Sequence, residues 1–148
     1  MLLRELLEEL VLAEELGSQT YEKIAEVNEG DIAKTTLIFA KEEKKHTKVI
    51  QYLSEVIEGL ENPVPEEVVL LLKKNSGKGE DPTFELEGAS RKQLFQYALQ
   101  IEKNSIELYE EIARHYEPDT VEMKEFIKLA KGERAHMYYI LKILHDLK

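Results

Sequence analysis

The chain has 148 residues, a length that suits one domain with a single sizeable hydrophobic core. It contains no cysteine, which excludes disulfides, thiolate zinc sites and iron–sulfur clusters, so any metal must be held by oxygen and imidazole nitrogen. The formal net charge of −10 argues against nucleic acid as a partner, because a phosphate backbone requires a basic face.

The sequence carries no export or membrane signal. Its first ten residues, MLLRELLEEL, mix apolar and charged side chains and lack the apolar core of a signal peptide. No segment reaches the roughly 18 consecutive apolar residues that a membrane span needs. We therefore expect a cytoplasmic protein that does not enter a membrane.

Apolar periodicity predicts two long helices in the first half of the chain. The first runs from about residue 2 to 28 and ends at the helix-stop signal Asn28-Glu29-Gly30. The second runs from about 32 to 57, with Asp31 as its expected N-cap. The short loop between them predicts an antiparallel hairpin over residues 2–57.

A long connection follows, over residues 58–89. It is rich in Pro, Gly and Asn, and its residues 66–74 could form a short helix. Loops of this length are uncommon inside compact domains. We expect the connection to cross the protein from end to end.

The second hairpin is predicted over residues 90–147. Ser90 is a plausible N-cap for its first helix, and Glu117-Pro118-Asp119 makes a tight turn before its second. The whole chain, 1–148, is therefore expected to form one all-α domain. Its architecture would be a four-helix bundle of two antiparallel hairpins joined by a long crossover.

The two halves of the sequence repeat one another. Residues 40–46, AKEEKKH, match residues 130–136, AKGERAH, at an offset of 90. A second match, at an offset of 88, pairs Glu14 and Tyr21 with Glu102 and Tyr109. A duplicated hairpin predicts an approximate internal two-fold axis.

Six polar residues occupy the stripes that should face the core: Glu14, Glu43, His46, Glu102, Glu133 and His136. Four carboxylates in an apolar interior are very costly unless something neutralises them, and these stripes supply no Lys or Arg. Two divalent cations would balance them, and two neutral imidazoles would complete the ligands. A Glu and a His three residues apart lie about one helical turn apart and can reach one metal. Iron and manganese suit these ligands, and zinc would also bind.

Other residues near these stripes have two interpretations. Tyr21 and Tyr109 could donate hydrogen bonds to metal-bound carboxylates, or could be ordinary aromatic core residues. Gly17 leaves room either for a substrate or for close helix packing. Glu42 is interpreted as a surface or rim residue. His115 and His145 have no partner at ligand spacing and are expected to be structural.

The pattern of Glu14 with Tyr21, Glu43-x-x-His46, Glu102 with Tyr109 and Glu133-x-x-His136 resembles the rubrerythrin branch of the ferritin-like di-iron proteins. The resemblance covers essentially the whole chain. It implies a ferritin-like bundle with two iron ions, often in a homodimer, that reduces hydrogen peroxide or dioxygen. It also implies that Glu43 and Glu133 bridge the metals and that Glu14 and Glu102 are terminal ligands.

The chain departs from rubrerythrins at two points. It lacks the cysteine-bound iron of their rubredoxin domain, so an electron donor such as a rubredoxin would be a separate protein. Ser105 stands three residues after Glu102, where those enzymes carry a further carboxylate. The favoured hypothesis is an oxidoreductase. Iron oxidation for storage or detoxification, and a non-enzymatic bundle stabilised by metal, stay open as alternatives.

Overall fold

The computed structural model describes residues 1–75 and 85–147 of the chain. They form helices and no strand, apart from one isolated bridge between Leu2 and Pro63. The helices are α1 (Leu3–Glu26), α2 (Gly30–Val56), α3 (Glu66–Asn75), α4 (Arg91–Arg114) and α5 (Val121–Asp146). The all-α prediction is confirmed for these residues, and so is the short helix within the connection. Residues 76–84 of the predicted crossover lie outside the described residues.

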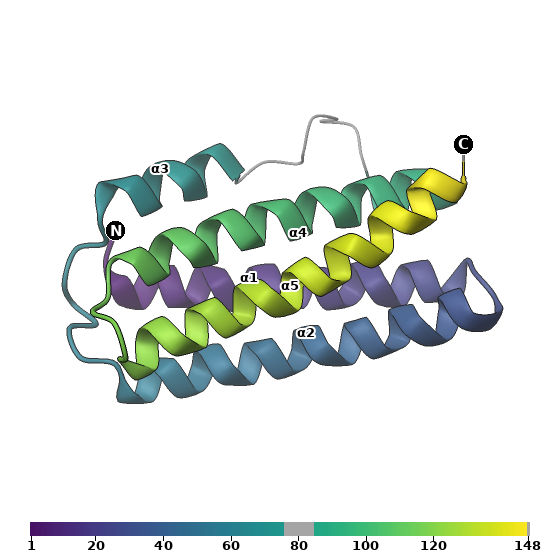
Figure 1. Cartoon of the computed structure of the whole chain (residues 1–148). Helices are drawn as coiled ribbons and strands as arrows, with labels where there is room; N and C mark the ends of the chain where they lie inside the picture. The colour runs from purple at the N-terminus through teal and green to yellow at the C-terminus, as the bar shows by residue number, and fades with distance from the viewer. Residues whose placement is uncertain (76–84, 148) are drawn as a thin grey trace.

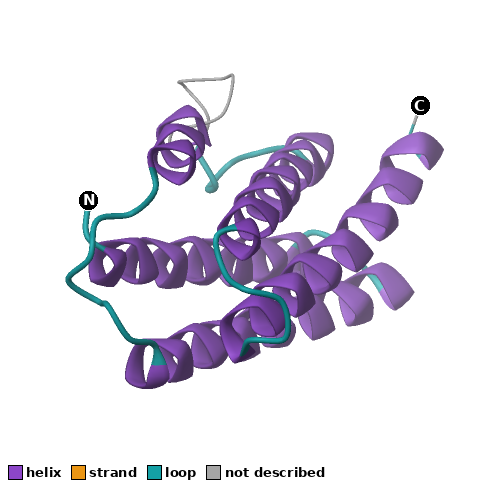
Figure 2. Ribbon diagram, turned by 60° about the vertical axis from the view of Figure 1, so that its left-hand side comes forward, coloured by secondary structure: helices purple, strands orange, loops and turns teal. Residues whose placement is uncertain are grey.

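The four long helices run lengthwise beside one another, with α3 packed on α4 (Figure 1). Helices α1 and α2 form one antiparallel hairpin, and α4 and α5 form the other. Helix α2 ends at one end of this bundle and α4 begins at the opposite end, so the chain passes from end to end between the hairpins. Figure 2 shows the same arrangement from the side. Within the described ranges, no helix is apolar over a stretch long enough to cross a membrane.

The N-cap predicted for α4 is confirmed, whereas the N-cap predicted for α2 is not. Ser90 caps α4 as predicted, accepting a hydrogen bond from the backbone N–H of Gln93, whose side chain in turn accepts from the Ser90 backbone. The prediction for Asp31 was wrong. Helix α2 begins about two residues earlier than predicted, at Gly30, and the N-cap residue is Glu29, whose side chain makes no capping hydrogen bond. Gly30 has a φ of +62°, and this left-handed backbone lets the chain reverse before Asp31 is reached.

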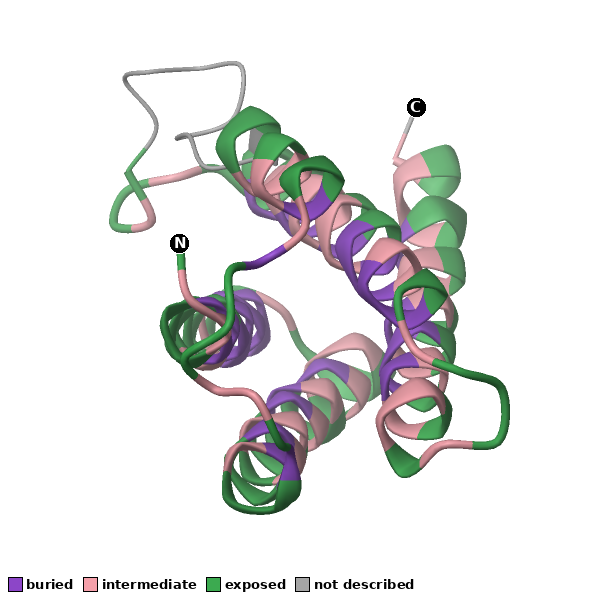
Figure 3. Cartoon of the chain, turned by 90° about the vertical axis from the view of Figure 1, so that its left-hand side faces the viewer, coloured by how far each residue is buried: buried purple, intermediate pink, exposed green. Residues whose placement is uncertain are grey.

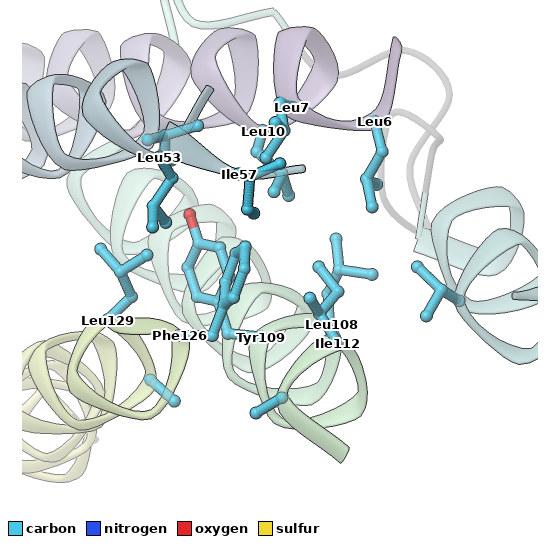
Figure 4. Close-up of a cluster of buried hydrophobic side chains, with 14 of the residues drawn as sticks. Leu6, Leu7, Leu10, Leu53, Ile57, Leu108, Tyr109, Ile112, Phe126 and Leu129 are labelled. Carbon is cyan, nitrogen blue, oxygen red and sulfur yellow. The ribbon is translucent and has the colours of Figure 1, made fainter. Parts of the chain in front are cut away.

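Buried residues line the inner faces of all four long helices (Figure 3). The larger apolar cluster, shown in Figure 4, includes Leu7, Leu10, Leu53, Ile112 and Phe126. A second cluster gathers Tyr21, Ile24, Ala40, Leu94, Phe95, Ala98 and Ile140. Along α1, Glu14 lies between Leu10 of the first cluster and Tyr21 of the second. The buried carboxylates therefore sit between two apolar layers, which exclude water from both sides.

Candidate metal centre

The four long helices bring all six predicted ligands together. Five of these side chains are buried: Glu14, Glu43, Glu102, Glu133 and His136. The sixth, His46, keeps 15% of its side chain exposed. Each ligand projects inward from a regular helix because it occupies an apolar stripe that must face the core. The site thus follows directly from the helical pattern.

The six side chains fall into two overlapping groups, each of which could hold a metal ion. One group is Glu14, Glu43, His46 and Glu133, and the other is Glu43, Glu102, Glu133 and His136. Within each group, one ligand atom from every residue lies within 4.8 Å of the others. Glu43 and Glu133 belong to both groups. They therefore have the position that a bridging carboxylate would need.

Each histidine turns Nδ1 toward the carboxylates. His46 Nδ1 lies 2.6 Å from Glu133 Oε1 and 3.3 Å from Glu14 Oε2. His136 Nδ1 lies 2.9 Å from Glu43 Oε1 and 3.6 Å from Glu102 Oε1. Both Nδ1 atoms thus face the carboxylate oxygens among which an ion would lie.

Despite these short approaches, seven buried ligand atoms have no partner with hydrogen-bond geometry. They are Glu14 Oε2, Glu43 Oε1, Glu102 Oε2, both carboxylate oxygens of Glu133, and Nδ1 of His46 and His136. Buried polar atoms are ordinarily hydrogen-bonded, since leaving them without a partner is costly. Lone pairs that converge in this way fit a cation between them. The oxygen and imidazole donors suit iron, manganese or zinc.

In the protein without metal, the central carboxylates resist ionisation. Burial and the nearby charge of Glu133 raise the pKa of Glu43 well above its ordinary value. Burial and the charge of Glu102 raise the pKa of Glu133 in the same way. Burial also raises the pKa of Glu102, to about 7. The metal-free site therefore retains protons near neutral pH, which a bound cation would displace.

The pKa values of Glu14 and His46 shift in the directions that keep both side chains charged. Burial works to raise the pKa of Glu14, but the proximity of Glu43 and His46 outweighs it and lowers this pKa. Burial works to lower the pKa of His46, but the close approach of the Glu133 and Glu14 carboxylates raises it to about 10. Without metal, Glu14 and His46 therefore form a charged pair at neutral pH.

Two tyrosines link the hairpins through the ligands. Tyr21 on α1 donates a hydrogen bond of 2.8 Å to Glu102 Oε1 on α4, and Tyr109 on α4 donates one to Glu14 Oε1 on α1. Burial, followed by the charge of the contacted carboxylate, raises the pKa of both hydroxyls well above 10. Both hydroxyls therefore stay protonated and can hold their carboxylates in place. Each tyrosine thus contacts the carboxylate of the other hairpin, and the two contacts are equivalent under the two-fold relation between the halves.

Gly17 makes room for a ligand. A Cβ atom at this position would lie 2.9 Å from Glu43 Oε2. The space left by the missing side chain is therefore filled by the Glu43 carboxylate.

Substitution Gly17→Ala is expected to weaken metal binding while preserving the fold. The added methyl must push the end of the Glu43 side chain away from the other ligands, so we expect about a tenfold or greater loss of affinity. Alanine is also favoured over glycine inside a helix by up to about 1 kcal/mol, so the metal-free variant should be no less stable. Metal titration and urea unfolding of the same preparations would check both parts. Unchanged affinity would contradict the role assigned to Gly17.

The structure adds contacts that the sequence did not predict. Glu42, interpreted above as a surface residue, is 42% exposed, but its Oε2 lies 2.6 Å from Nε2 of His136. Phe39 stacks on His136 with ring centroids 4.2 Å apart. Helical periodicity places Glu42 on the outer edge of α2. It gives no sign of which side chain on α5 lies opposite.

Three other residues singled out in the sequence have different surroundings. His115 is near Glu67 and Glu111, and His145 is near Asp146. Ser105 is half-buried and lines a cavity of about 280 Å³ together with Tyr109. The structure thus brings neither His115 nor His145 to the metal site.

No family model, curated protein or solved structure matches this chain. The fold and the site therefore define its class: an all-α protein with a buried cluster of glutamates and histidines that could hold metal.

Proposed function

We propose that this chain is a ferritin-like, non-haem di-iron protein of the rubrerythrin kind. It would reduce hydrogen peroxide or dioxygen with electrons from a separate donor protein. The observation that carries the proposal is the pair of overlapping ligand groups that share Glu43 and Glu133. Carboxylate and histidine ligands contributed by four helices are typical of di-iron and di-manganese bundles.

One ion would be held by Glu14, Glu43, Glu133 and His46, and the other by Glu43, Glu102, Glu133 and His136. A pair of ferrous ions supplies two electrons, enough with two protons to reduce hydrogen peroxide to two molecules of water. Four carboxylates balance the charge of two divalent ions, so the loaded site carries no large net charge into the core.

The protein surroundings suit this chemistry in two ways. The apolar clusters on either side exclude water, which strengthens the electrostatic interactions within the site. The hydroxyls of Tyr21 and Tyr109 hold the two outer carboxylates, Glu102 and Glu14, so these ligands need little reorganisation when metal binds. The chain's own contribution is thus a dry site whose ligands are already oriented.

The first test is anaerobic loading with ferrous iron, followed by desalting and elemental analysis. We expect about two irons per chain, as in other carboxylate-bridged bundles. The loaded protein should then consume hydrogen peroxide or dioxygen, and a chemical reductant should restore the ferrous form. Iron close to zero in a folded protein would overturn the proposal.

The same preparations separate the alternatives. Ferrous oxidation for storage would require a shell-forming oligomer, whereas we expect size-exclusion chromatography to show a homodimer. A structural role would appear as tight zinc binding together with an iron form that peroxide does not oxidise. Catalytic turnover with added reductant distinguishes the proposed enzyme from both.

A further inference from the structure

The two histidines of the candidate metal centre differ at their outer nitrogens. His136 Nε2 lies 2.6 Å from Glu42 Oε2. The carboxylate contacts of His46 are both made by Nδ1, to Glu133 and Glu14. Over residues 1–75 and 85–147, no other carboxylate oxygen lies within 4.0 Å of a ring nitrogen of His46. Of the two imidazole rings, only that of His136 therefore has a carboxylate at its Nε2 atom, the nitrogen that points away from the other ligands.

The internal repeat explains this difference. In the matched segments, Glu42 of α2 corresponds to Gly132 of α5. A Cβ atom at position 132 would lie 3.0 Å from His46 Nε2. Gly132 therefore occupies the place from which a carboxylate would contact His46. The two halves therefore differ in what lies behind the two ligand histidines.

The Glu42 contact has a direct consequence for His136. A carboxylate oxygen at 2.6 Å accepts a hydrogen bond from an imidazole N–H, so this contact favours the His136 tautomer that carries its proton on Nε2. Nδ1 then has a free lone pair, and it is this atom that faces Glu43 and Glu102. Stacking on Phe39 further restricts the ring. A carboxylate behind a metal-binding histidine fixes its tautomer and raises its basicity.

His46 has a more open environment. Its side chain is 15% exposed, against 1% for His136. Its ring also lines a small pocket of about 70 Å³, together with Glu125 and Lys128. The His46 side of the site is therefore the one that reaches the protein surface.

We propose that Glu42 is a positioning residue that makes the two halves of the metal site unequal. The half that contains Glu102 and His136 fills first and holds its ion more tightly. The half that contains Glu14 and His46 exchanges its ion more readily. This inference rests on the proposed function, because it requires that the site bind two ions.

Anaerobic calorimetric titration with ferrous iron tests the proposal. The wild-type protein should bind iron in two steps of different affinity. Substitution Glu42→Gln should weaken the tighter step by roughly 10- to 100-fold and change the other little. The matched control is Glu110→Gln, since Glu110 is similarly exposed, at 39%, but contacts Arg134 rather than a ligand. That variant should titrate like the wild type.

Two further variants assign the steps. His136→Gln should remove the tighter step and His46→Gln the weaker one. If Glu42→Gln titrates like Glu110→Gln, or if His46→Gln loses the tighter step, the proposal is overturned while the metal site stands.

A measurement without metal separates this inference from the proposed function. Nitrogen-15 NMR of the chelator-treated protein should show His136 protonated at Nε2, and Glu42→Gln should convert it to a mixture of tautomers. An unchanged tautomer in Glu42→Gln overturns the role of Glu42. Failure of the wild-type protein to bind iron would instead overturn the proposed function, and with it the inequality of the two halves.

Discussion

The Glu133→Ala variant is expected to bind no iron at either position, whereas Glu14→Ala should still bind one ion. Glu133 belongs to both ligand groups, and Glu14 belongs to only one. Removal of a shared carboxylate takes a ligand from both ions and leaves three carboxylates to balance two divalent charges. We expect a loss of affinity of at least roughly 100-fold, about 2.7 kcal/mol, for each ion. Glu43→Ala should behave in the same way as Glu133→Ala.

Elemental analysis after anaerobic loading and desalting would measure this difference, with circular dichroism as the check on folding. We expect the metal-free variants to stay folded, because removal of one buried carboxylate relieves repulsion among the others. Glu110→Gln again serves as a control on the surface of the same bundle. Equal iron content in Glu14→Ala and Glu133→Ala would contradict the overlapping arrangement.

The metal-free protein is expected to lose stability as the pH rises from about 5 to 9. Glu43 and Glu133 have pKa values raised well above 4.5, and the pKa of Glu102 is raised to about 7, chiefly by burial. Between the ordinary and the raised pKa, the folded state binds more protons than the unfolded state, so increasing pH favours unfolding. A difference of one pKa unit corresponds to about 1.4 kcal/mol.

Two further ligands, His46 and Glu14, do not reverse this trend. The pKa of His46 is raised from 6.5 to about 10 by contacts with Glu133 and Glu14 that outweigh burial, so its stabilising effect also disappears as the pH rises. The pKa of Glu14 is lowered, so its opposite contribution to the pH dependence falls away as the pH rises above 4.5. Above about pH 5, the net pH dependence contributed by these five ligands therefore has one sign.

Urea unfolding of the chelator-treated protein at several pH values would measure this effect. The Glu43→Gln/Glu133→Gln double variant should show a much weaker pH dependence, because its amides do not titrate. Bound metal should offset the loss, adding about 2.7 kcal/mol when the free ion is at 100 times its dissociation constant. A metal-free wild-type protein that becomes more stable toward pH 9 would refute the prediction.

Much of the site could be predicted from the sequence because helical periodicity assigns each residue to a face. Glu14 and Glu102 occupy stripes of apolar residues, so they had to face the core once the helices formed. The repeat then indicated that the two halves would contribute equivalent ligands. Ser90 was predicted as a helix cap for a similar reason, since capping depends on residues close in the sequence.

Only the tertiary structure decided which side chains meet across helices. Tyr21 lies on the same helix as Glu14 but donates to Glu102, and Glu42 reaches His136 from a different helix. The Glu43 carboxylate proved to lie against the position that a side chain at residue 17 would occupy. Periodicity fixes the face on which a residue lies, but the partner opposite depends on the rotation and axial offset of the packed helices. Those two quantities arise from the packing of all the side chains together, so no local stretch of the chain encodes them.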